Sequence, residues 1–380
     1  MVTVEEFVVD IDEETIVDLQ DRVRRARWPE RQTVDDWSQG VPLEIVHELC
    51  AYWADGYDWR ARQARLNAVD HFTTVIDGLA VHFVHVRSPH PDARPLVLTH
   101  GWPGSFAEFL DVVPALVDPT AHGGSAEDAF HVVCPSLPGF TFSGKPETSG
   151  WGIERIADAW AELMTRLGYD RFGAQGGDWG AGVSQELAIR HPQRLSGLHL
   201  NLVLAAPTDT GDLTDAEQAS LVSARSRAHW DNGYVAIQST RPQTIGYSLT
   251  DSPTGLCAWI LEKLWAWTDH DDDLWSVIDR DAALDLVTLY WVTSCGASAA
   301  RIYWESVRSL GRLGVGPPVE TPTGCVVAPR ELVRPSRRWA DQIYRDIRRW
   351  TEPDRGGHFL ALERPALFVD EVRAFFALVR

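Results

Sequence analysis

One aspartate enclosed by glycines constrains this chain more than any other feature of its sequence. Residues 176–180 read Gly-Gly-Asp-Trp-Gly, and a helical pattern over residues 181–192 follows them. This is the pattern of a sharp strand-to-helix turn, in which Asp178 would occupy a strained backbone conformation and a neighbouring Cβ would collide with the turn. A Gly-Gly-Asp tripeptide is usually only a turn, so its interpretation depends on the segments before and after it.

An apolar segment with a polar end precedes this turn. Residues 95–100 (Pro-Leu-Val-Leu-Thr-His) are typical of a buried parallel strand, and they continue into Gly-Trp-Pro-Gly at residues 101–104. A turn of this kind can supply one backbone N–H of an oxyanion hole, here from Trp102, and the N–H of Trp179 would be the second donor. By itself the segment is equally well explained as an ordinary Gly/Pro turn.

Two further candidate residues follow downstream. Residues 322–328 form a short apolar segment typical of a buried strand, and Glu331 lies just beyond its end. His358 follows two glycines, on an expected loop ahead of an amphipathic helix over residues 365–379. In the α/β-hydrolase triad the nucleophile comes first along the chain, the acid second and the histidine last, and the three candidates here follow that order.

The acid of such a triad has competitors in this sequence. Glu352 and Asp354 are also acidic, but they lie too close to His358 in the chain to project from the neighbouring strand. Glu331 is therefore favoured as the residue that orients the imidazole.

Taken together, these motifs resemble epoxide hydrolases of the microsomal and juvenile-hormone type, within the α/β-hydrolase superfamily. The resemblance implies an α/β fold: a hydrolase core with a mostly parallel eight-stranded sheet, a helical cap inserted after strand six, and a helical N-terminal domain. The stretches that carry it span nearly the whole chain: residues 7–30, 52–60, 72–86, 234–238, 251–263 and 355–359.

The domain organisation follows from the change in pattern along the chain. Helical patterns fill residues 11–65, Asp77-Gly78 indicates a hairpin within residues 70–90, and strands alternate with helices until an apolar strand at 198–204. The strand pattern then gives way to aromatic-rich helices before it resumes near Gly324. We therefore expect a helical N-terminal domain (1–68), the first part of the core (69–205), a helical cap (206–312) and the second part of the core (313–380).

An aspartate nucleophile is already ionised near neutral pH, so the histidine is free for a later step. The chemistry expected is attack of Asp178 on an epoxide carbon to give an alkyl ester, which water activated by His358 and Glu331 then hydrolyses to a vicinal diol. The resemblance places two phenols that protonate the departing oxygen at Tyr234 and Tyr303. Four cap tryptophans are candidates for lining an apolar pocket: Trp230, Trp259, Trp265 and Trp267.

Two other functions remain open on the sequence. A haloalkane dehalogenase would share Asp178 and His358 and could use the indole of Trp179 to bind halide, although the two tyrosines and the N-terminal segment argue against it. A non-catalytic carrier of lipophilic ligands would have no use for an intact Asp-Glu-His set. A serine esterase is excluded, because no Gly-x-Ser-x-Gly turn stands at residues 176–180.

Bulk composition excludes several partners. A formal net charge of −19 argues against nucleic-acid binding, and five scattered cysteines with no ligand spacing indicate no metal and a reducing compartment. We expect no cofactor. The acidic N-terminus lacks a long apolar segment, so we expect no membrane anchor and a cytoplasmic enzyme whose partners are a small-molecule epoxide and water. The sequence leaves open a homo-oligomer, the identity of the bulky, apolar epoxide, and whether the role is biosynthesis of secondary metabolites or detoxification.

Overall fold

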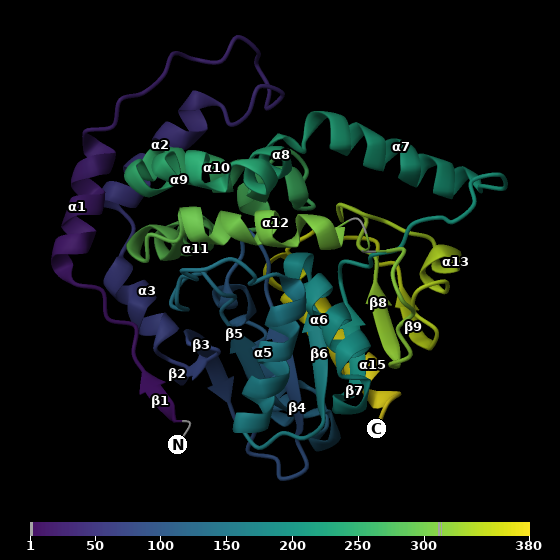
Figure 1. Ribbon diagram of the computed structural model, residues 1–380. Helices are drawn as coiled ribbons and strands as arrows, with labels where there is room; N and C mark the ends of the chain where they lie inside the picture. The colour runs from purple at the N-terminus through teal and green to yellow at the C-terminus, as the bar shows by residue number, and fades with distance from the viewer. Residues whose placement is uncertain (1–2, 311, 313) are drawn as a thin grey trace.

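A central mixed sheet organises the computed structural model, which describes residues 3–310, 312 and 314–380. Within these residues the sheet has nine strands, in the order β1-β2-β3-β5-β4-β6-β7-β8-β9 (Figure 1). Their bounds are β1 Val4–Phe7, β2 His71–Ile76, β3 Leu79–Val86, β4 Arg94–Thr99, β5 Phe130–Pro135, β6 Phe172–Gly176, β7 Leu195–Leu200, β8 Thr323–Val326 and β9 Ile347–Thr351. The expected mostly parallel α/β sheet is confirmed, with one strand more than the expected eight because β1 pairs antiparallel with β2.

The direction of the strands changes within the sheet. Strands β1, β2, β3 and β5 pair antiparallel in succession, whereas every pair from β5 through β4 to β9 is parallel. The hairpin expected at Asp77-Gly78 is present between β2 and β3, and both residues have the positive φ (50° and 79°) that its tight turn requires. Connections run in opposite directions on either side of β4, where a crevice forms at the carboxyl ends of the strands.

Helices cover both faces of the sheet. On one face lie α5 (Ile153–Arg166) and α6 (Asp178–Arg190), and behind the sheet lies α15 (Pro365–Ala377) (Figure 1). The short helix α4 (Val113–Val117) contacts α15. The aromatic rings of α15 lie so close to glycines of β7 and β8 that an added Cβ there would need the rings to move. With helices against both faces, the central parallel strands β6 and β8 are fully buried, whereas the edge strand β9 is only partly buried.

A layer of helices crosses the carboxyl ends of the strands, where Figure 1 shows it above the sheet. These helices are α7 Asp215–Trp230, α8 Gly233–Thr240, α9 Pro242–Asp251, α10 Pro253–Trp267, α11 Arg280–Val292 and α12 Gly296–Leu310. The short helices α13 (Arg337–Ala340) and α14 (Leu360–Glu363) belong to the segment that follows. We refer to α7–α12 as the cap.

The N-terminal helices pack against the cap. They are α1 Glu13–Arg24, α2 Leu43–Asp55 and α3 Trp59–Leu66, and α1 and α2 both contact α10. Buried hydrogen bonds fix the arrangement: the Trp53 indole donates to Thr288 (2.9 Å), and the Tyr57 hydroxyl donates to Asp285 (2.8 Å). The N-terminal segment therefore holds the cap in position from outside the site.

Two expected element boundaries are wrong. The strand expected at 198–204 is β7, which runs over Leu195–Leu200, because Leu202 and Val203 stay buried beyond the sheet and so extend the apolar pattern. Helix α6 begins at Asp178 itself, three residues before the expected start at 181. Residue 313, with which the second part of the core is expected to begin, lies outside the described residues, as do 1–2 and 311.

Neither a membrane-spanning helix nor a cluster of metal ligands is found among the described residues. No helix there combines the length and the apolar composition needed to cross a bilayer. No group of three or more histidine, cysteine, aspartate or glutamate side chains in that part of the chain is arranged to hold a metal ion.

Candidate active site

Asp178 is the first residue of α6, at the carboxyl end of the central strand β6. Its φ is +49°, in the left-handed region that non-glycine residues rarely adopt. The turn is possible because glycines surround it: a Cβ at Gly180 would overlap the backbone of Thr99 in the neighbouring strand. The sharp turn therefore lifts the Asp178 carboxyl out of the sheet and into the crevice.

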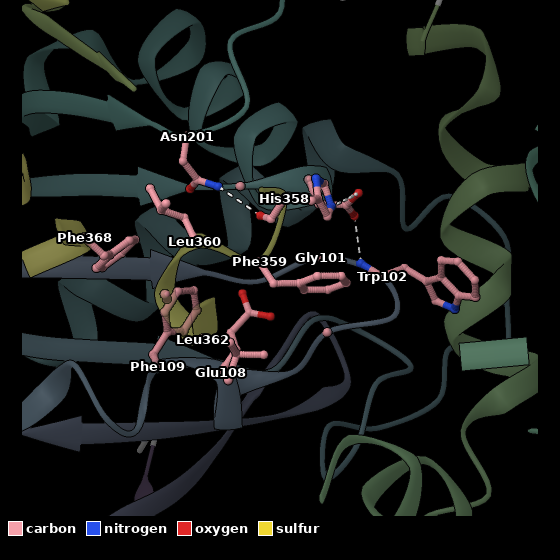
Figure 2. Close-up of a pocket in the computed structure, with 14 residues that line it drawn as sticks. Gly101, Trp102, Glu108, Phe109, Asn201, His358, Phe359, Leu360, Leu362 and Phe368 are labelled. Atoms are coloured by element: carbon pink, nitrogen blue, oxygen red, sulfur yellow. Dashed lines mark hydrogen bonds and ion pairs between the residues drawn. The ribbon is translucent and has the colours of Figure 1, made fainter. Parts of the chain in front are cut away.

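The turn after β4 approaches this carboxyl from the adjacent strand. The backbone N–H of Trp102 donates a 2.7 Å hydrogen bond to Asp178 Oδ1. Gly101 makes this approach possible, because a Cβ there would overlap the carboxyl group of Asp178. The backbone of Trp102 faces the site, and its ring points away toward the cap (Figure 2).

Of the two N–H donors expected for an oxyanion hole, one contacts the carboxyl. Within the described residues, the N–H of Trp179 makes no hydrogen bond to Asp178. The ring of Trp179 packs edge-on against that of Tyr303, with ring centroids 4.8 Å apart. Trp102 thus fixes one oxygen of the carboxylate, and the other oxygen faces the imidazole of His358.

His358 lies between the two expected carboxylates. Its Nε2 is 3.2 Å from Asp178 Oδ2, and its Nδ1 is 2.7 Å from Glu331 Oε1. Both His358 and Glu331 are buried, whereas Glu352 and Asp354 are exposed. The geometry therefore brings Glu331, and not the two acids closer in sequence, into contact with the imidazole.

The charges around His358 change its protonation. Burial by itself lowers the pKa of His358, but the carboxylates of Glu331 and Asp178 outweigh burial, so the pKa lies well above the usual range of an imidazole. In this arrangement the imidazole is protonated between two anions. Loss of the Asp178 charge would remove one of the two groups that favour this protonation.

The loop that carries His358 is tied to the cap. The His358 backbone N–H donates to the carbonyl of Trp267 at the end of α10 (2.8 Å). The Glu363 carboxylate accepts from the backbone N–H groups of Phe359 (3.0 Å) and Asp269 (2.7 Å). The position of the imidazole is thus set jointly by the core and by the end of α10.

The two expected tyrosines come from different cap helices, Tyr234 from α8 and Tyr303 from α12, and both are buried. Their ring centroids are 5.7 Å apart. Both rings contact Trp102, Tyr234 by stacking (5.1 Å) and Tyr303 edge-on (5.8 Å). The structure therefore places both phenols beside the turn that holds Asp178.

Both phenols remain protonated at neutral pH. Burial is the main cause that raises the pKa of Tyr234 and of Tyr303 above the usual range, and the charge of Asp178 acts in the same direction on each. Two neutral O–H groups can therefore donate hydrogen bonds to an oxygen atom that approaches from the site.

The four cap tryptophans have different environments. Trp267 lies against His358 (centroids 5.0 Å apart) and Tyr234 (5.3 Å), so it contributes to the site wall. Trp265 stacks on Trp37 of the N-terminal segment (4.4 Å), and the indole of Trp259 donates to Gln238. Trp230 is 77% exposed on α7.

The structure adds site residues that the sequence analysis missed. Glu108 and Asn201 line a small cavity of about 20 Å³ together with Asp178 and His358 (Figure 2). Burial raises the pKa of Glu108 to about 8; the nearby His358 opposes this effect and Asp178 adds to it. A sequence signal exists for Glu108, because it is the one charged residue of an otherwise apolar segment (106–110) after the Gly/Pro turn.

Comparisons with known proteins show the family to which the chain belongs. The family described as "Epoxide hydrolase N terminus" matches residues 4–109, and the family described as "alpha/beta hydrolase fold" matches residues 94–240. A relative from Stigmatella aurantiaca (strain DW4/3-1), named "Putative epoxide hydrolase", is 52% identical over 98% of this chain and 85% of its own. Epoxide hydrolase 1 of Sus scrofa is 34% identical over 98% of this chain and 88% of its own.

Among solved structures, juvenile hormone epoxide hydrolase from the silkworm Bombyx mori superimposes with a TM-score of 0.91 at 29% identity. The superposition covers 100% of this chain and 95% of that one. The similarity therefore includes the N-terminal helices and the cap as well as the hydrolase core. The chain belongs to the epoxide hydrolase family, and it is an α/β-hydrolase-fold enzyme that acts on epoxides.

Proposed function

We propose that this enzyme converts a bulky, apolar epoxide to a vicinal diol through a covalent ester on Asp178. The observation that carries the proposal is the position of the Asp178 carboxylate, with one oxygen 2.7 Å from the Trp102 N–H and the other 3.2 Å from the His358 imidazole. A nucleophile next to a base that is itself oriented by a third group is the arrangement of covalent catalysis.

Ester formation comes first in the proposed mechanism. A carboxylate oxygen of Asp178 attacks an epoxide carbon, the carbon–oxygen bond of the strained ring breaks, and the ring oxygen leaves with the electron pair. Tyr234 and Tyr303 donate hydrogen bonds to that oxygen, and one of them transfers its proton. Their burial next to Trp102 supports this role, because an alkoxide needs an acid within reach to depart.

Ester formation also prepares the second step. Once Asp178 is esterified its negative charge is gone, so one of the causes that raise the pKa of His358 disappears. The imidazole then becomes a better base, oriented by Glu331 through the 2.7 Å contact at Nδ1. The tyrosine that gave up its proton can recover it from the imidazolium through solvent.

Hydrolysis of the ester needs one water molecule beside the imidazole. The cavity of about 20 Å³ lined by Glu108, Asp178 and His358 meets the minimum volume of about 10–15 Å³ for one water. His358 deprotonates this water, and the resulting hydroxide attacks the carbonyl carbon of the ester. The bond from that carbon to the ester oxygen then breaks, the imidazolium protonates the departing diol oxygen, and the carboxyl group left on Asp178 returns a proton to the imidazole. The N–H groups of Trp102 and Trp179 stabilise the oxyanion that forms on Asp178, a contribution of roughly 100-fold for each donor.

The surroundings of the two tyrosines support an apolar substrate. Aromatic side chains pack around Tyr234 and Tyr303: Trp102, Trp179 and Trp267. Such surroundings favour a ligand with a large apolar surface, because its transfer from water contributes about 25 cal/mol per Å² buried. Aryl-bearing epoxides are therefore the first substrates to test.

A single turnover in oxygen-18 water tests the covalent mechanism. With enzyme in excess over styrene oxide, the first diol should contain no label, and mass spectrometry should find one labelled oxygen in the peptide that carries Asp178. Labelled diol in the first turnover would mean that water attacks the epoxide directly. Asp178→Ala should form no diol, and Glu352→Gln, which changes an exposed acid beside the same loop, should react like the wild type.

The same assay separates the proposal from dehalogenation. Chloro- and bromoalkanes of similar size should release no halide, because the two phenols are donors suited to a basic oxygen and not to a halide ion. Halide release at a rate comparable to diol formation would contradict the assignment of Tyr234 and Tyr303.

We also propose that the enzyme works in the cytoplasm. All five cysteines are buried free thiols, which is the usual state in a reducing compartment. Fractionation of the source cells should recover epoxide-opening activity in the high-speed supernatant, and recovery in the membrane pellet would contradict the proposal.

A further inference from the structure

A buried lysine lies behind one of the two tyrosines. Lys263 belongs to α10 and is only 3% exposed, and its Nζ lies 4.4 Å from the centroid of the Tyr234 ring. It is also 5.8 Å from the ring of Trp267. Among the described residues, the only carboxylate within 4.0 Å of this ammonium is that of the adjacent Glu262, at 2.5 Å.

This position is costly for a lysine. Transfer of an ammonium from water into an apolar environment is unfavourable, and an ion pair often fails to compensate for the desolvation of its members. The aromatic faces of Tyr234 and Trp267 compensate in part, because a cation is attracted to the negative face of a ring. An apolar side chain of similar length would fill the same space without this cost, so packing alone does not account for a lysine at residue 263.

The two tyrosines differ in whether a cation lies over the ring. Tyr303 is enclosed by the rings of Trp102, Trp179 and Tyr234. No lysine or arginine of the described chain lies over its ring, whereas Lys263 lies over that of Tyr234. A cation beside a phenol stabilises the phenolate more than the neutral phenol, because the attraction grows with the negative charge on the ring and oxygen.

We propose that Lys263 is a positioning residue that makes Tyr234 the proton donor to the epoxide oxygen and leaves Tyr303 as a hydrogen-bond donor. The inference rests on the proposed ester mechanism and assigns different roles to its two phenols. As the Asp178 oxygen bonds to carbon, the carbon–oxygen bond of the epoxide breaks and its oxygen takes the Tyr234 proton. Tyr234 keeps the electron pair of its O–H bond, and Lys263 stabilises the phenolate until it is reprotonated.

Single-turnover kinetics of Lys263→Met test the inference. Ester formation with styrene oxide, followed by tryptophan fluorescence and by quenched-flow mass spectrometry, should slow by roughly tenfold, the effect of about one pKa unit on a proton donor. Ester hydrolysis should keep its wild-type rate, because that step uses His358 and Glu331. If the substitution only disturbed the structure, it would shift Trp267, whose ring centroid lies 5.0 Å from that of His358. Such a shift would slow ester hydrolysis as well.

A double-mutant cycle identifies the tyrosine through which Lys263 acts. In the Tyr303→Phe background, Lys263→Met should again slow ester formation by roughly tenfold. In the Tyr234→Phe background it should have no further effect, because the group that it stabilises is absent. Equal effects in both backgrounds would overturn the inference.

Glu262→Gln is the matched control. It removes the charged partner of Lys263, and also a negative charge that raises the pKa of Tyr234, so ester formation should proceed at the wild-type rate or faster. If Glu262→Gln slows ester formation as much as Lys263→Met does, the ion pair acts by maintaining the local structure and not by stabilising the phenolate. That result would overturn the inference.

The thermal stability of the variant shows whether a slower reaction reflects a damaged fold. Lys263→Met should unfold thermally close to the wild-type temperature, because it removes a buried charge but leaves the Glu262 carboxylate, which is 29% exposed, without its partner. Should that variant fail to fold, Lys263→Gln replaces it in the same cycle. If the wild type forms the ester and the Lys263 variants form it at the same rate, this inference is rejected and the proposed mechanism stands. If the wild type forms no ester, the proposed mechanism is rejected together with this inference.

Discussion

The imidazole Nε2 of His358 lies 3.2 Å from Oδ2 of Asp178, although the two residues follow different strands, β9 and β6, of the same sheet. At this distance the two groups form an ion pair in the free enzyme, and Glu331 holds the imidazole from its other side. The pairing links the two halves of the proposed cycle, because esterification of Asp178 removes the charge that stabilises the imidazolium.

His358→Gln should separate the two steps. Ester formation needs only Asp178 and the phenols, whereas hydrolysis needs the base, so the alkyl-enzyme should form and persist. Intact-protein mass spectrometry after mixing with styrene oxide should show an adduct of the epoxide's mass on the peptide that carries Asp178. Rapid loss of the adduct, at the wild-type rate, would mean that His358 is not the base.

Tyr234→Phe and Tyr303→Phe should each slow ester formation without changing the rate of ester hydrolysis. Removal of a general acid typically costs roughly 100-fold or more, and removal of a hydrogen-bond donor costs less. The larger loss is expected for Tyr234, which has Lys263 over its ring. Tyr247→Phe is the control, because Tyr247 is 70% exposed on the cap and should not affect either step.

Glu108→Gln and Glu108→Leu should act on the hydrolytic step. The carboxyl of Glu108 lines the cavity beside His358, where it can hold a water molecule by hydrogen bonds. The amide keeps hydrogen-bonding atoms and should slow ester hydrolysis by less than roughly tenfold, whereas leucine should slow it by roughly 100-fold. Accumulation of the ester under steady-state turnover would be the measurement, and an unchanged hydrolysis rate in Glu108→Leu would show that the water binds elsewhere.

The folded protein should lose stability in mild acid because of its buried histidines. Burial lowers the pKa of His100 and of His199 from 6.5 to about 4, so the fold favours their neutral forms. Below pH 6.5 the unfolded chain binds these protons and the folded chain does not, so the free energy of unfolding falls as the pH drops toward 4. Each residue should contribute on the order of 1–2 kcal/mol of this loss between about pH 6.5 and about pH 5.

His199→Leu tests this origin of the acid sensitivity. Both ring nitrogens of His199 are buried without a hydrogen-bond partner, and the ring packs beside Phe375 of α15. Urea unfolding should show that the variant is at least as stable as the wild type near neutral pH, with a smaller loss in acid. A pH dependence identical to that of the wild type would mean that His199 titrates normally in the folded protein.

Much of this protein follows from local sequence. The glycines around Asp178 and after His100 specify two sharp turns, because only a residue without a Cβ fits where a strand end meets a helix or a carboxyl group. The apolar segments before them indicate parallel strands, and the chain order of Asp178, Glu331 and His358 indicates a hydrolase core. These features are local patterns, so they can be read without knowledge of the fold.

Tertiary structure alone decided the rest, because the remaining contacts join segments that are distant in the chain. The cavity lined by Glu108 depends on how four separate segments of the core meet. The position of Lys263 above the ring of Tyr234 depends on how α10 packs against α8 within the cap. Strand β1 was missed because its four residues gain their hydrogen bonds from β2, far along the chain. The end of β7 was misjudged because the buried residues Leu202 and Val203 continue the apolar pattern beyond the sheet. Periodicity records which side chains are buried, and only the packed structure shows which groups they meet.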